Sequence, residues 1–253
     1  IEAHAASLFG TLDDLGQFDC VILSHVLEHV QDLHVAAKAV AQRTAPGGVA
    51  YIEVPDATRY VDCLVAPFQD FNTEHINHFS TVSLTNLMIG SGFSVYETGT
   101  KTIWASPQAP YPALYGFFAN TPVAVPGEMR QDRELRLKIA EYIAQSQAML
   151  DAMDQALRNV LARSPEVVVW GTGQLAMKLL VETVLKEAKI LAFVDGNPIN
   201  QGRLLRGVPI LSPAEFARQG WLQPIIISTT LHSVAITDLI RTQLRLENEL
   251  IQL

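Results

Sequence analysis

Two parts of this chain alternate short apolar runs with segments of helical periodicity, and this alternation constrains the fold more than any other feature. In the first hundred residues, strands are expected at 18–23, 49–54 and 93–96, with helical patterns at 25–40 and 80–89 between them. Continuous apolar runs of strand length are typical of strands buried in a parallel sheet. The pattern therefore predicts a wound α/β sheet, with strand 18–23 buried inside it.

A second α/β unit is expected from Pro165 onward. Strands are predicted at 167–170, 190–194 and 224–228, and helices at 174–187 and 234–246. Ser212, Pro213 and Glu215 form a capping-box sequence with proline in the first turn, so another helix begins there. This unit is expected to be a second Rossmann-like lobe.

The segment between the two units divides into a proline-rich stretch and a long helical stretch. Residues 106–127 contain five prolines and four aromatic residues, which favours a connector that packs on a neighbouring surface, and residues 128–163 contain neither Pro nor Gly. A helix of that length spans roughly 50 Å, which suits it to joining two lobes or to a homodimer contact. We therefore expect domains at 1–105 and 164–253, joined by a connector and long helix at 106–163.

Composition excludes several classes of protein. The apolar fraction of 49% and the charged fraction of 17% are those of a packed globular chain, and no apolar run approaches the roughly 20 residues that span a bilayer. A net charge of −8 argues against binding to nucleic acid. Cys20 and Cys63 cannot build a disulfide framework or a zinc site, and His34 and His232 lack metal-ligand spacing. We expect a cytoplasmic protein with a small-molecule substrate and no metal.

The most informative string is FDCVILSHVLEHV at 18–30, followed by Pro46, Gly47 and Gly48. It resembles the fourth strand and following loop of S-adenosylmethionine-dependent methyltransferases with a Rossmann-like fold. Loops at the carboxyl ends of parallel strands line the ligand crevice in such folds. The resemblance implies that Ser24 and His25 lie beside the cofactor S-adenosylmethionine and that His4 and Ala5 flank its adenine.

A second string, EHINHFS at 74–80, resembles the EHxxYFS element of sugar C-methyltransferases, which act on nucleotide-linked keto sugars. The resemblance implies that His75 is the general base that removes a proton from the carbon next to a ketone, with Glu74 orienting its ring. An imidazole is suited to this transfer because its pKa lies near neutrality. His78 stands where the family has tyrosine and is the next candidate. In the alternative interpretation, His75 and His78 only fix a loop by hydrogen bonding.

The third string is GTGQLA at 171–176, which follows a strand and opens a helix, with Asp195 after the next strand. Glycines at Gly171 and Gly173 let the backbone turn tightly and approach a phosphate, and an acid at this distance can bind a ribose. Taken alone, this pattern favours NAD. The segment also resembles the carboxy-terminal Rossmann-like domain of the sugar C-methyltransferases, which implies that Gly171, Gly173 and Asp195 bind substrate. A third interpretation is that the glycines only shape a turn.

The sequence therefore predicts an S-adenosylmethionine-dependent methyltransferase that methylates a carbon of a nucleotide-linked keto sugar or a related small molecule. The glycine-rich loop of such enzymes does not precede Asp19, and the chain starts at Ile1 without a signal-peptide pattern. We accordingly expect the chain to be part of a longer protein. Two alternatives stay open: an NAD(P)-binding oxidoreductase that uses the Gly171 loop, and a non-catalytic nucleotide-binding module.

Overall fold

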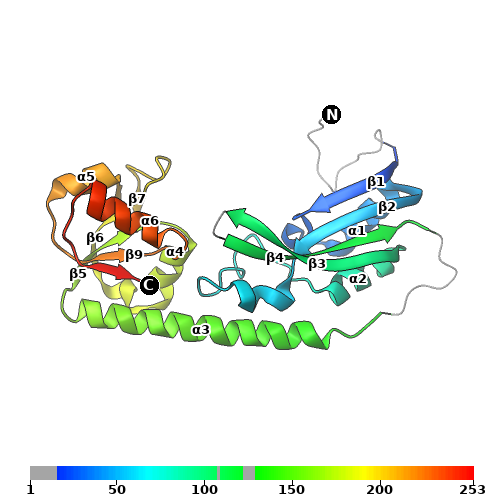
Figure 1. The fold of residues 1–253 in the computed structure, drawn as a ribbon, viewed down its shortest axis with the longest axis horizontal. Helices are drawn as coiled ribbons and strands as arrows, with labels where there is room; N and C mark the ends of the chain where they lie inside the picture. Colours follow the sequence, from blue (N-terminus) through cyan, green and yellow to red (C-terminus); the bar gives the residue numbers. More distant parts are fainter. Residues whose placement is uncertain (1–15, 107–108, 122–128) are drawn as a thin grey trace. The chain divides into compact units, whose positions relative to one another are not determined.

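The computed structural model describes residues 16–106, 109–121 and 129–253 (Figure 1). The chain divides into two compact units. The first takes in the described residues through Cys63 and residues 70–143, and the second takes in residues 64–69 and 144–253. None of the described helices is both long and apolar enough to cross a membrane. His4 and Ala5 lie outside the described residues.

The first unit is built on a four-stranded mixed sheet in the order β1-β2-β4-β3. Parallel pairing joins β1 (Phe18–Ser24) to β2 (Thr44–Pro55), and β4 (Ala109–Ala119) runs antiparallel to both β2 and β3 (Ser94–Ser106). Helices α1 (Leu33–Arg43) and α2 (Thr81–Gly90) pack their apolar residues against those of the strands in one core cluster. Short 3-10 segments, η2 (Leu27–His29) and η3 (Ala57–Cys63), follow β1 and β2.

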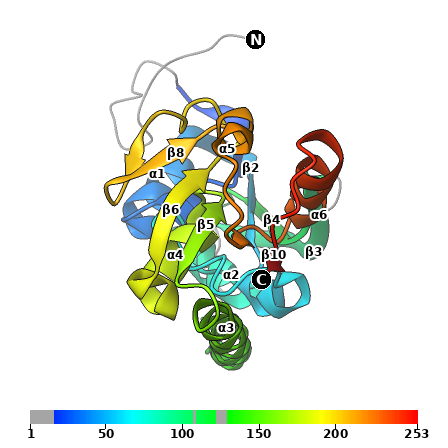
Figure 2. The ribbon, with the colours of Figure 1, turned by 90° about the vertical axis from the view of Figure 1, so that its left-hand side faces the viewer.

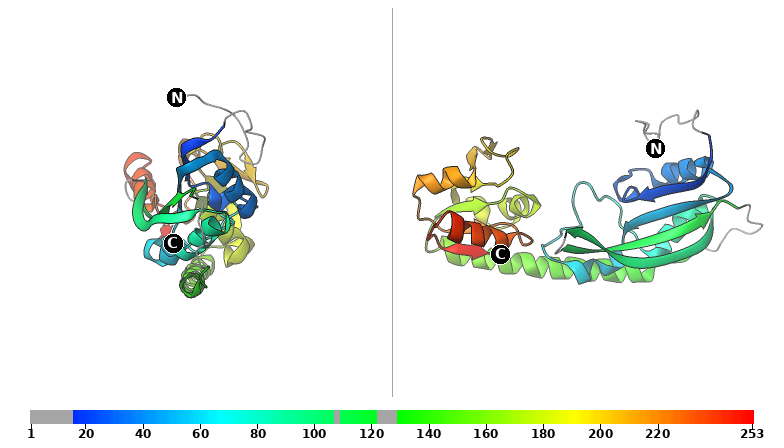
Figure 3. Two further views of the ribbon diagram at one scale, coloured as in Figure 1. Left: turned by 90° about the vertical axis from the view of Figure 1, so that its right-hand side faces the viewer. Right: turned by 45° about the horizontal axis from the view of Figure 1, so that its top comes forward.

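The prediction of a connector at 106–127 is wrong for residues 109–119, because these residues form strand β4 inside the sheet. The prolines in this segment, Pro110 and Pro112 among them, are the reason that the sequence favours a connector over a strand. Both lie beyond the end of β2, whose last residue pairs with Ala113, and among the described strands they pair with β3 alone (Figure 3). A strand tolerates proline where the missing N–H would face no neighbouring strand. Phe118, expected to pack on another surface, is buried in the core of the first unit.

Strand β1 forms as predicted, but it is not buried on both faces. Among the described residues it has a strand neighbour only on the side of β2, and Phe18, Cys20 and Ile22 are exposed, with Ile22 at 66%. Leu23 points to the core and is buried. An apolar run of this length does not distinguish a central strand from a strand whose second face is open.

The helical pattern predicted from residue 25 begins later in the structure. Helix α1 starts at Leu33, because Asp32 caps it by accepting a hydrogen bond from the backbone N–H of Val35 at 3.0 Å. Residues 25–32 form an irregular loop that contains η2, and His25 adopts a φ of +53° there. In this loop His25 and Glu28 contact each other at 3.1 Å, whereas Leu27 packs into the core.

Helix α3 (Arg133–Leu161) is the long helix that the sequence predicts, shorter by a few residues at each end. Its residues through Ile143 belong to the first unit, and the remainder belong to the second. In the second unit, α3 contributes Leu150, Met153 and Leu157 to a buried apolar cluster. The single helix thus supplies side chains to both units.

The second unit is a six-stranded sheet in the order β10-β9-β5-β6-β8-β7, parallel except for the β7–β8 hairpin (Figure 2). Its strands are β5 (Glu166–Trp170), β6 (Lys189–Val194), β7 (Leu204–Leu205), β8 (Val208–Leu211), β9 (Ile225–Ile227) and β10 (Leu250–Gln252). Its helical segments, besides α3, are α4 (Gln174–Glu182), η4 (Val184–Glu187), α5 (Pro213–Gln219), α6 (Ser233–Asp238) and the π-helical η5 (Leu239–Gln243). Separate core clusters lie on the two faces of β5: one contains Val167 and Val169, and the other Val168 and Trp170.

The glycine loop between β5 and α4 is shaped by a close contact with the end of β9. Gly171 has a φ of +109°, and a Cβ atom there would lie 2.9 Å from Oγ of Ser228. That hydroxyl donates to the carbonyl of Trp170 at 2.9 Å. Gly173, the N-cap of α4, has an ordinary φ of −79°, and nothing lies within 4 Å of a Cβ built on it. Only the first glycine is therefore required by the fold.

The carboxylate of Asp195, at the end of β6, is held within this loop region. It accepts hydrogen bonds from the Thr172 hydroxyl, from the backbone N–H of Asn197 at 2.8 Å and from the amide of Asn200 at 3.1 Å. Burial opposes ionisation of this carboxyl group, but the hydrogen bonds outweigh it and lower its pKa. The folded structure thus favours the ionised carboxylate of Asp195.

Replacing Gly171 with Ala should destabilise the protein, because the new methyl group meets Ser228 and the left-handed φ is strained for any L side chain. A loss of about 1–3 kcal/mol is expected from such backbone strain. Gly173→Ala is the matched control and should change stability little, since its methyl group enters open space. Urea unfolding followed by tryptophan fluorescence measures both variants. Equal stabilities would contradict the assigned role of Gly171.

The lowered pKa of Asp195 makes its contribution to stability dependent on pH. Since the folded pKa lies below the unfolded value of about 3.9, the contribution is present above that value and is lost as pH falls through the folded pKa. Asp195→Asn should therefore be less stable than the parent at pH 6, and the difference should shrink below pH 4. Unfolding curves from pH 6 to pH 3 provide the measurement. A difference that stays constant with pH would show that the charge of Asp195 is not involved.

Candidate functional site

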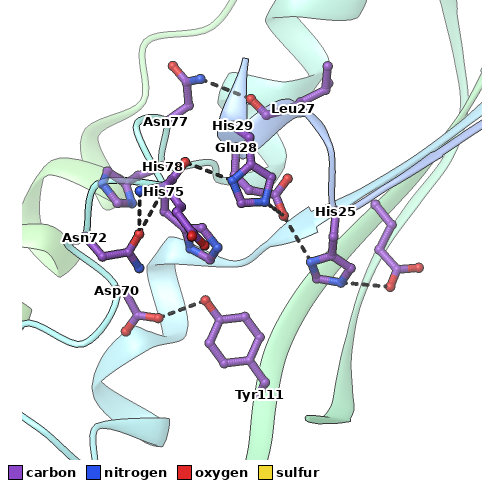
Figure 4. A network of polar contacts seen from close by, with 12 residues as sticks. His25, Leu27, Glu28, His29, Asp70, Asn72, His75, Asn77, His78 and Tyr111 are labelled. Carbon is purple, nitrogen blue, oxygen red and sulfur yellow. Dashed lines mark hydrogen bonds and ion pairs between the residues drawn. The ribbon is translucent and has the colours of Figure 1, made fainter. Parts of the chain in front are cut away.

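The carboxyl ends of β1 and β2 lie side by side, and the loop 72–78 is bound against η2 beside them (Figure 4). The carbonyl of Glu28 accepts hydrogen bonds from the backbone N–H groups of Ile76 at 2.9 Å and Asn77 at 3.1 Å. The Asn77 amide donates to the carbonyls of Leu27 at 3.0 Å and Val30 at 2.6 Å. The two strings that the sequence singled out, 18–30 and 74–80, therefore form one site.

His25 lies between two buried carboxylates at this edge of the sheet. Its Nδ1 is 3.1 Å from Oε1 of Glu28, and its Nε2 is 3.3 Å from Oε1 of Glu53, although this second contact lacks hydrogen-bond geometry. The hydrogen bond to Glu28 raises the pKa of His25, against the opposing effect of burial. The site thus favours a protonated His25.

Glu53 is kept ionised by two further groups on the sheet. Its Oε2 accepts hydrogen bonds from Nζ of Lys101 at 2.6 Å and from the hydroxyl of Tyr51 at 2.5 Å. Burial alone would raise the pKa of Glu53, but these hydrogen bonds and the charge of Lys101 lower it. Ser24, which pairs with Glu53 in the β1–β2 register, is exposed at the end of its strand.

His75 lies beside Glu28 and His29. Its ring centroid is 4.9 Å from that of His29 in an edge-on arrangement, and its Nδ1 is buried with no hydrogen-bond partner in the described part of the chain. Burial lowers the pKa of His75, against the attraction of Glu28. The lowered pKa favours the neutral ring, which has a lone pair that can accept a proton.

Glu74 and His78 are close to His75 in the sequence, but Glu74 does not orient the His75 ring as predicted. The exposed side chain of Glu74 forms no hydrogen bond to His75 among the described residues. The backbone N–H groups of both residues donate to Oδ1 of Asn72, at 2.8 and 2.9 Å. His78 packs against aromatic rings, and its Nδ1 lies 3.2 Å from the Tyr60 hydroxyl. Burial, together with the charge of a protonated His75, lowers the pKa of His78.

Sequence reasoning missed several polar residues of this site. Glu28 and His29 stood within the quoted string but were assigned no role. Asp70 and Tyr111 gave no signal, and Tyr111 lies on the strand that was predicted to be a connector. The Tyr111 hydroxyl donates to Oδ1 of Asp70 at 2.8 Å, and burial together with this carboxylate raises the pKa of Tyr111. Their proximity arises only when β4 enters the sheet.

The predicted binding residues of the second unit cluster at the carboxyl ends of β5 and β6. Gly171 and Gly173 flank Thr172, whose hydroxyl donates to Asp195. Because Asp195 already accepts bonds from its own loop, its carboxylate is largely occupied within the protein. The open space at Gly173 is the part of this loop that a ligand could approach.

Comparisons with known proteins found a family match that overlaps the first unit. Residues 2–98 match the family model of a methyltransferase domain. C-methyltransferase NovU of Streptomyces niveus is 27% identical over 205 residues, which are 75% of this chain and 46% of that protein. The chain thus spans less than half the length of this curated relative.

Two solved structures resemble parts of the chain. An O-methyltransferase family protein from Burkholderia thailandensis is 22% identical, with a TM-score of 0.33 over 46% of this chain and 35% of its own. A SAM-dependent methyltransferase from Methanosarcina mazei is 14% identical, with a TM-score of 0.35 over 47% of this chain and 66% of its own. Likeness at this level describes part of each fold and says nothing of activity.

The family match covers the strand and loop in which the structure places Ser24, His25 and Glu28. It also extends through the loop that carries His75 to the beginning of β3. Residues 2–98 thus resemble a methyltransferase domain, and the chain is similar over 205 residues to a C-methyltransferase.

Proposed function

We propose that this protein takes part in S-adenosylmethionine-dependent methylation of a carbon next to a ketone, in a nucleotide-linked keto sugar or a related small molecule, with His75 as the base. One observation carries the proposal: a neutral, half-buried imidazole lies beside a buried carboxylate at the carboxyl ends of two parallel strands. The C-methyltransferase name of the similar NovU protein supports methylation of carbon. The resemblance of residues 74–80 to sugar C-methyltransferases supports the keto-sugar class.

The residues present fit one wall of a cofactor site. Ser24 offers an exposed hydroxyl at the end of β1. His25 follows Ser24 at this strand end, with its ring between the carboxylates of Glu28 and Glu53. Ser24 and His25 would hold the cofactor, which when bound supplies an electrophilic methyl group. His4 and Ala5 stay predicted contacts for its adenine.

His75 and its surroundings account for the proton transfer. The neutral ring accepts the proton of the carbon next to the ketone, and the electron pair of that C–H bond moves into an enolate. The resulting imidazolium is stabilised by the nearby charge of Glu28, which favours the protonated form of His75. The hydrogen bond that the backbone N–H of His75 donates to Oδ1 of Asn72 keeps the loop in place. In this proposal Glu74 and His78 support the loop, and His78 is the next candidate for the base.

His75→Ala should lower turnover by roughly 10²–10⁴, the usual contribution of a positioned acid–base group. The assay uses the full-length protein, S-adenosylmethionine and a nucleotide-linked keto sugar. Exchange of the substrate proton with D2O, followed by NMR, should fall in parallel, because this step depends on the base and precedes methyl transfer.

His34→Ala is the matched control, since His34 is an exposed histidine on α1. It should keep normal turnover and normal exchange. If His75→Ala retained both rates, the proposed base would be wrong, and the same measurements on His78→Ala would follow.

We further propose that the second unit binds the nucleotide part of the substrate at the loop 171–173. Support comes from the open space at Gly173 and from its position as the N-cap of the nine-residue helix α4. Backbone N–H groups at a helix N-terminus favour phosphate. Asp195 shapes this loop through Thr172 and is expected to act on the ligand through that contact.

Gly173→Val should weaken binding of a nucleoside diphosphate sugar by at least tenfold, because its branched side chain fills the space in front of the helix N-terminus. The fold should tolerate the change, since no atom lies within 4 Å of the new Cβ. Calorimetric titrations with the sugar nucleotide and with S-adenosylmethionine measure both affinities. If the variant lost affinity for S-adenosylmethionine but kept its affinity for the sugar nucleotide, the assignment of the nucleotide to loop 171–173 would be wrong.

A further inference from the structure

Glu28 is a buried carboxylate whose charge is only partly satisfied by the described residues. Its side chain is 1% exposed, and Oε1 contacts Nδ1 of His25 at 3.1 Å. Oε2 has no hydrogen-bond partner among the described residues. An unsatisfied buried charge is costly, so such an atom in a folded protein indicates a missing proton donor or cation.

His29 presents a ring nitrogen to this carboxylate in the form that a metal ion requires. Its Nδ1 lies 2.8 Å from the carbonyl of Glu74, which can only accept, so Nδ1 carries the proton. The lone pair is therefore on Nε2, which lies 3.8 Å from Oε1 of Glu28. Metal-binding histidines commonly donate the other ring N–H to a backbone carbonyl in this way, because it fixes the tautomer and the ring orientation.

His75 completes a group of three ligands. One ligand atom from each of Glu28, His29 and His75 lies within 4.8 Å of the other two. Zinc–ligand bonds of about 2.0–2.2 Å place ligand atoms roughly 3.4 Å apart, so modest side-chain rotations would close the group around an ion. Because Nδ1 of His75 is buried without a partner, such a rotation breaks no hydrogen bond of that atom.

We propose that Glu28, His29 and His75 bind a divalent transition-metal cation. Two imidazoles and one carboxylate suit Zn²⁺ and its neighbours Co²⁺ and Fe²⁺, whereas Mg²⁺ and Ca²⁺ prefer oxygen ligands alone. The half-exposed side chain of His29 leaves an approach from solvent. The cation would satisfy Glu28, and it would leave a coordination position for water or a small anion.

Cation binding has a consequence for catalysis that rests on the proposed function. A ring nitrogen of His75 that binds a metal cannot accept a proton from substrate. Zn²⁺ should therefore inhibit methyl transfer and the D2O exchange at the same concentrations at which it occupies the site. The binding site itself does not depend on that function.

The test uses untagged, metal-free protein titrated with Co²⁺, whose visible absorption reports coordination by nitrogen ligands, and with Zn²⁺ in a calorimeter. One equivalent should bind with saturation, and Zn²⁺ should displace Co²⁺. His29→Ala should weaken binding at least tenfold. Folding is expected to survive this change because the side chain is half exposed. Glu28→Gln should also weaken binding, because the amide removes the negative charge.

His34→Ala is again the matched control and should bind both metals as the parent does. The absence of a saturable Co²⁺ spectrum, or equal affinities in the parent and His29→Ala, would overturn the proposal. If Co²⁺ binds as described but His75→Ala keeps full turnover, the metal site stands and His75 is not the base. If metal binding fails while His75→Ala loses turnover, the proposed function stands without the cation.

Discussion

The site depends on the hydrogen bonds that hold loop 74–78 against η2. The Glu28 carbonyl accepts from two consecutive backbone N–H groups of the loop, and the Asn77 side chain donates to the carbonyls of Leu27 in η2 and of Val30 just after it. These bonds hold the loop against η2, and His75 is placed beside Glu28 as a result.

Burial and charge act in opposite directions on the pKa values of three histidines of this region, His25, His75 and His78. His25 contacts the two carboxylates of Glu28 and Glu53, so its pKa is raised. Within the described residues neither His75 nor His78 forms an ion pair with a carboxylate, so burial dominates and their pKa values are lowered. Neighbouring imidazoles thus favour different protonation states at the same pH. A site that combines one protonated imidazole with neutral imidazoles can both bind an anionic group and accept a proton.

Strand β4 gives this site part of its support. It pairs along both β2 and β3, and it carries Tyr111 to the carboxylate of Asp70. The backbone N–H of Asp70 in turn donates to the hydroxyl of Tyr142 on α3 at 2.9 Å. Residues from a strand, a loop and a helix, far apart in the sequence, therefore hold the start of the loop that leads to His75.

The periodicity of the sequence determined the two α/β units, the long helix and the capped helix after Ser212, because apolar spacing and capping are local properties. The family-like strings also indicated Ser24, His25 and His75 as candidate site residues. Only the tertiary structure decided that Pro110 and Pro112 lie in a strand, since their tolerance depends on where β2 ends. It likewise decided that Glu28 and His29 meet His75. Local sequence carries no information about a contact between residues more than 40 positions apart, which is formed by the pairing of β1 with β2 and the loop hydrogen bonds to η2.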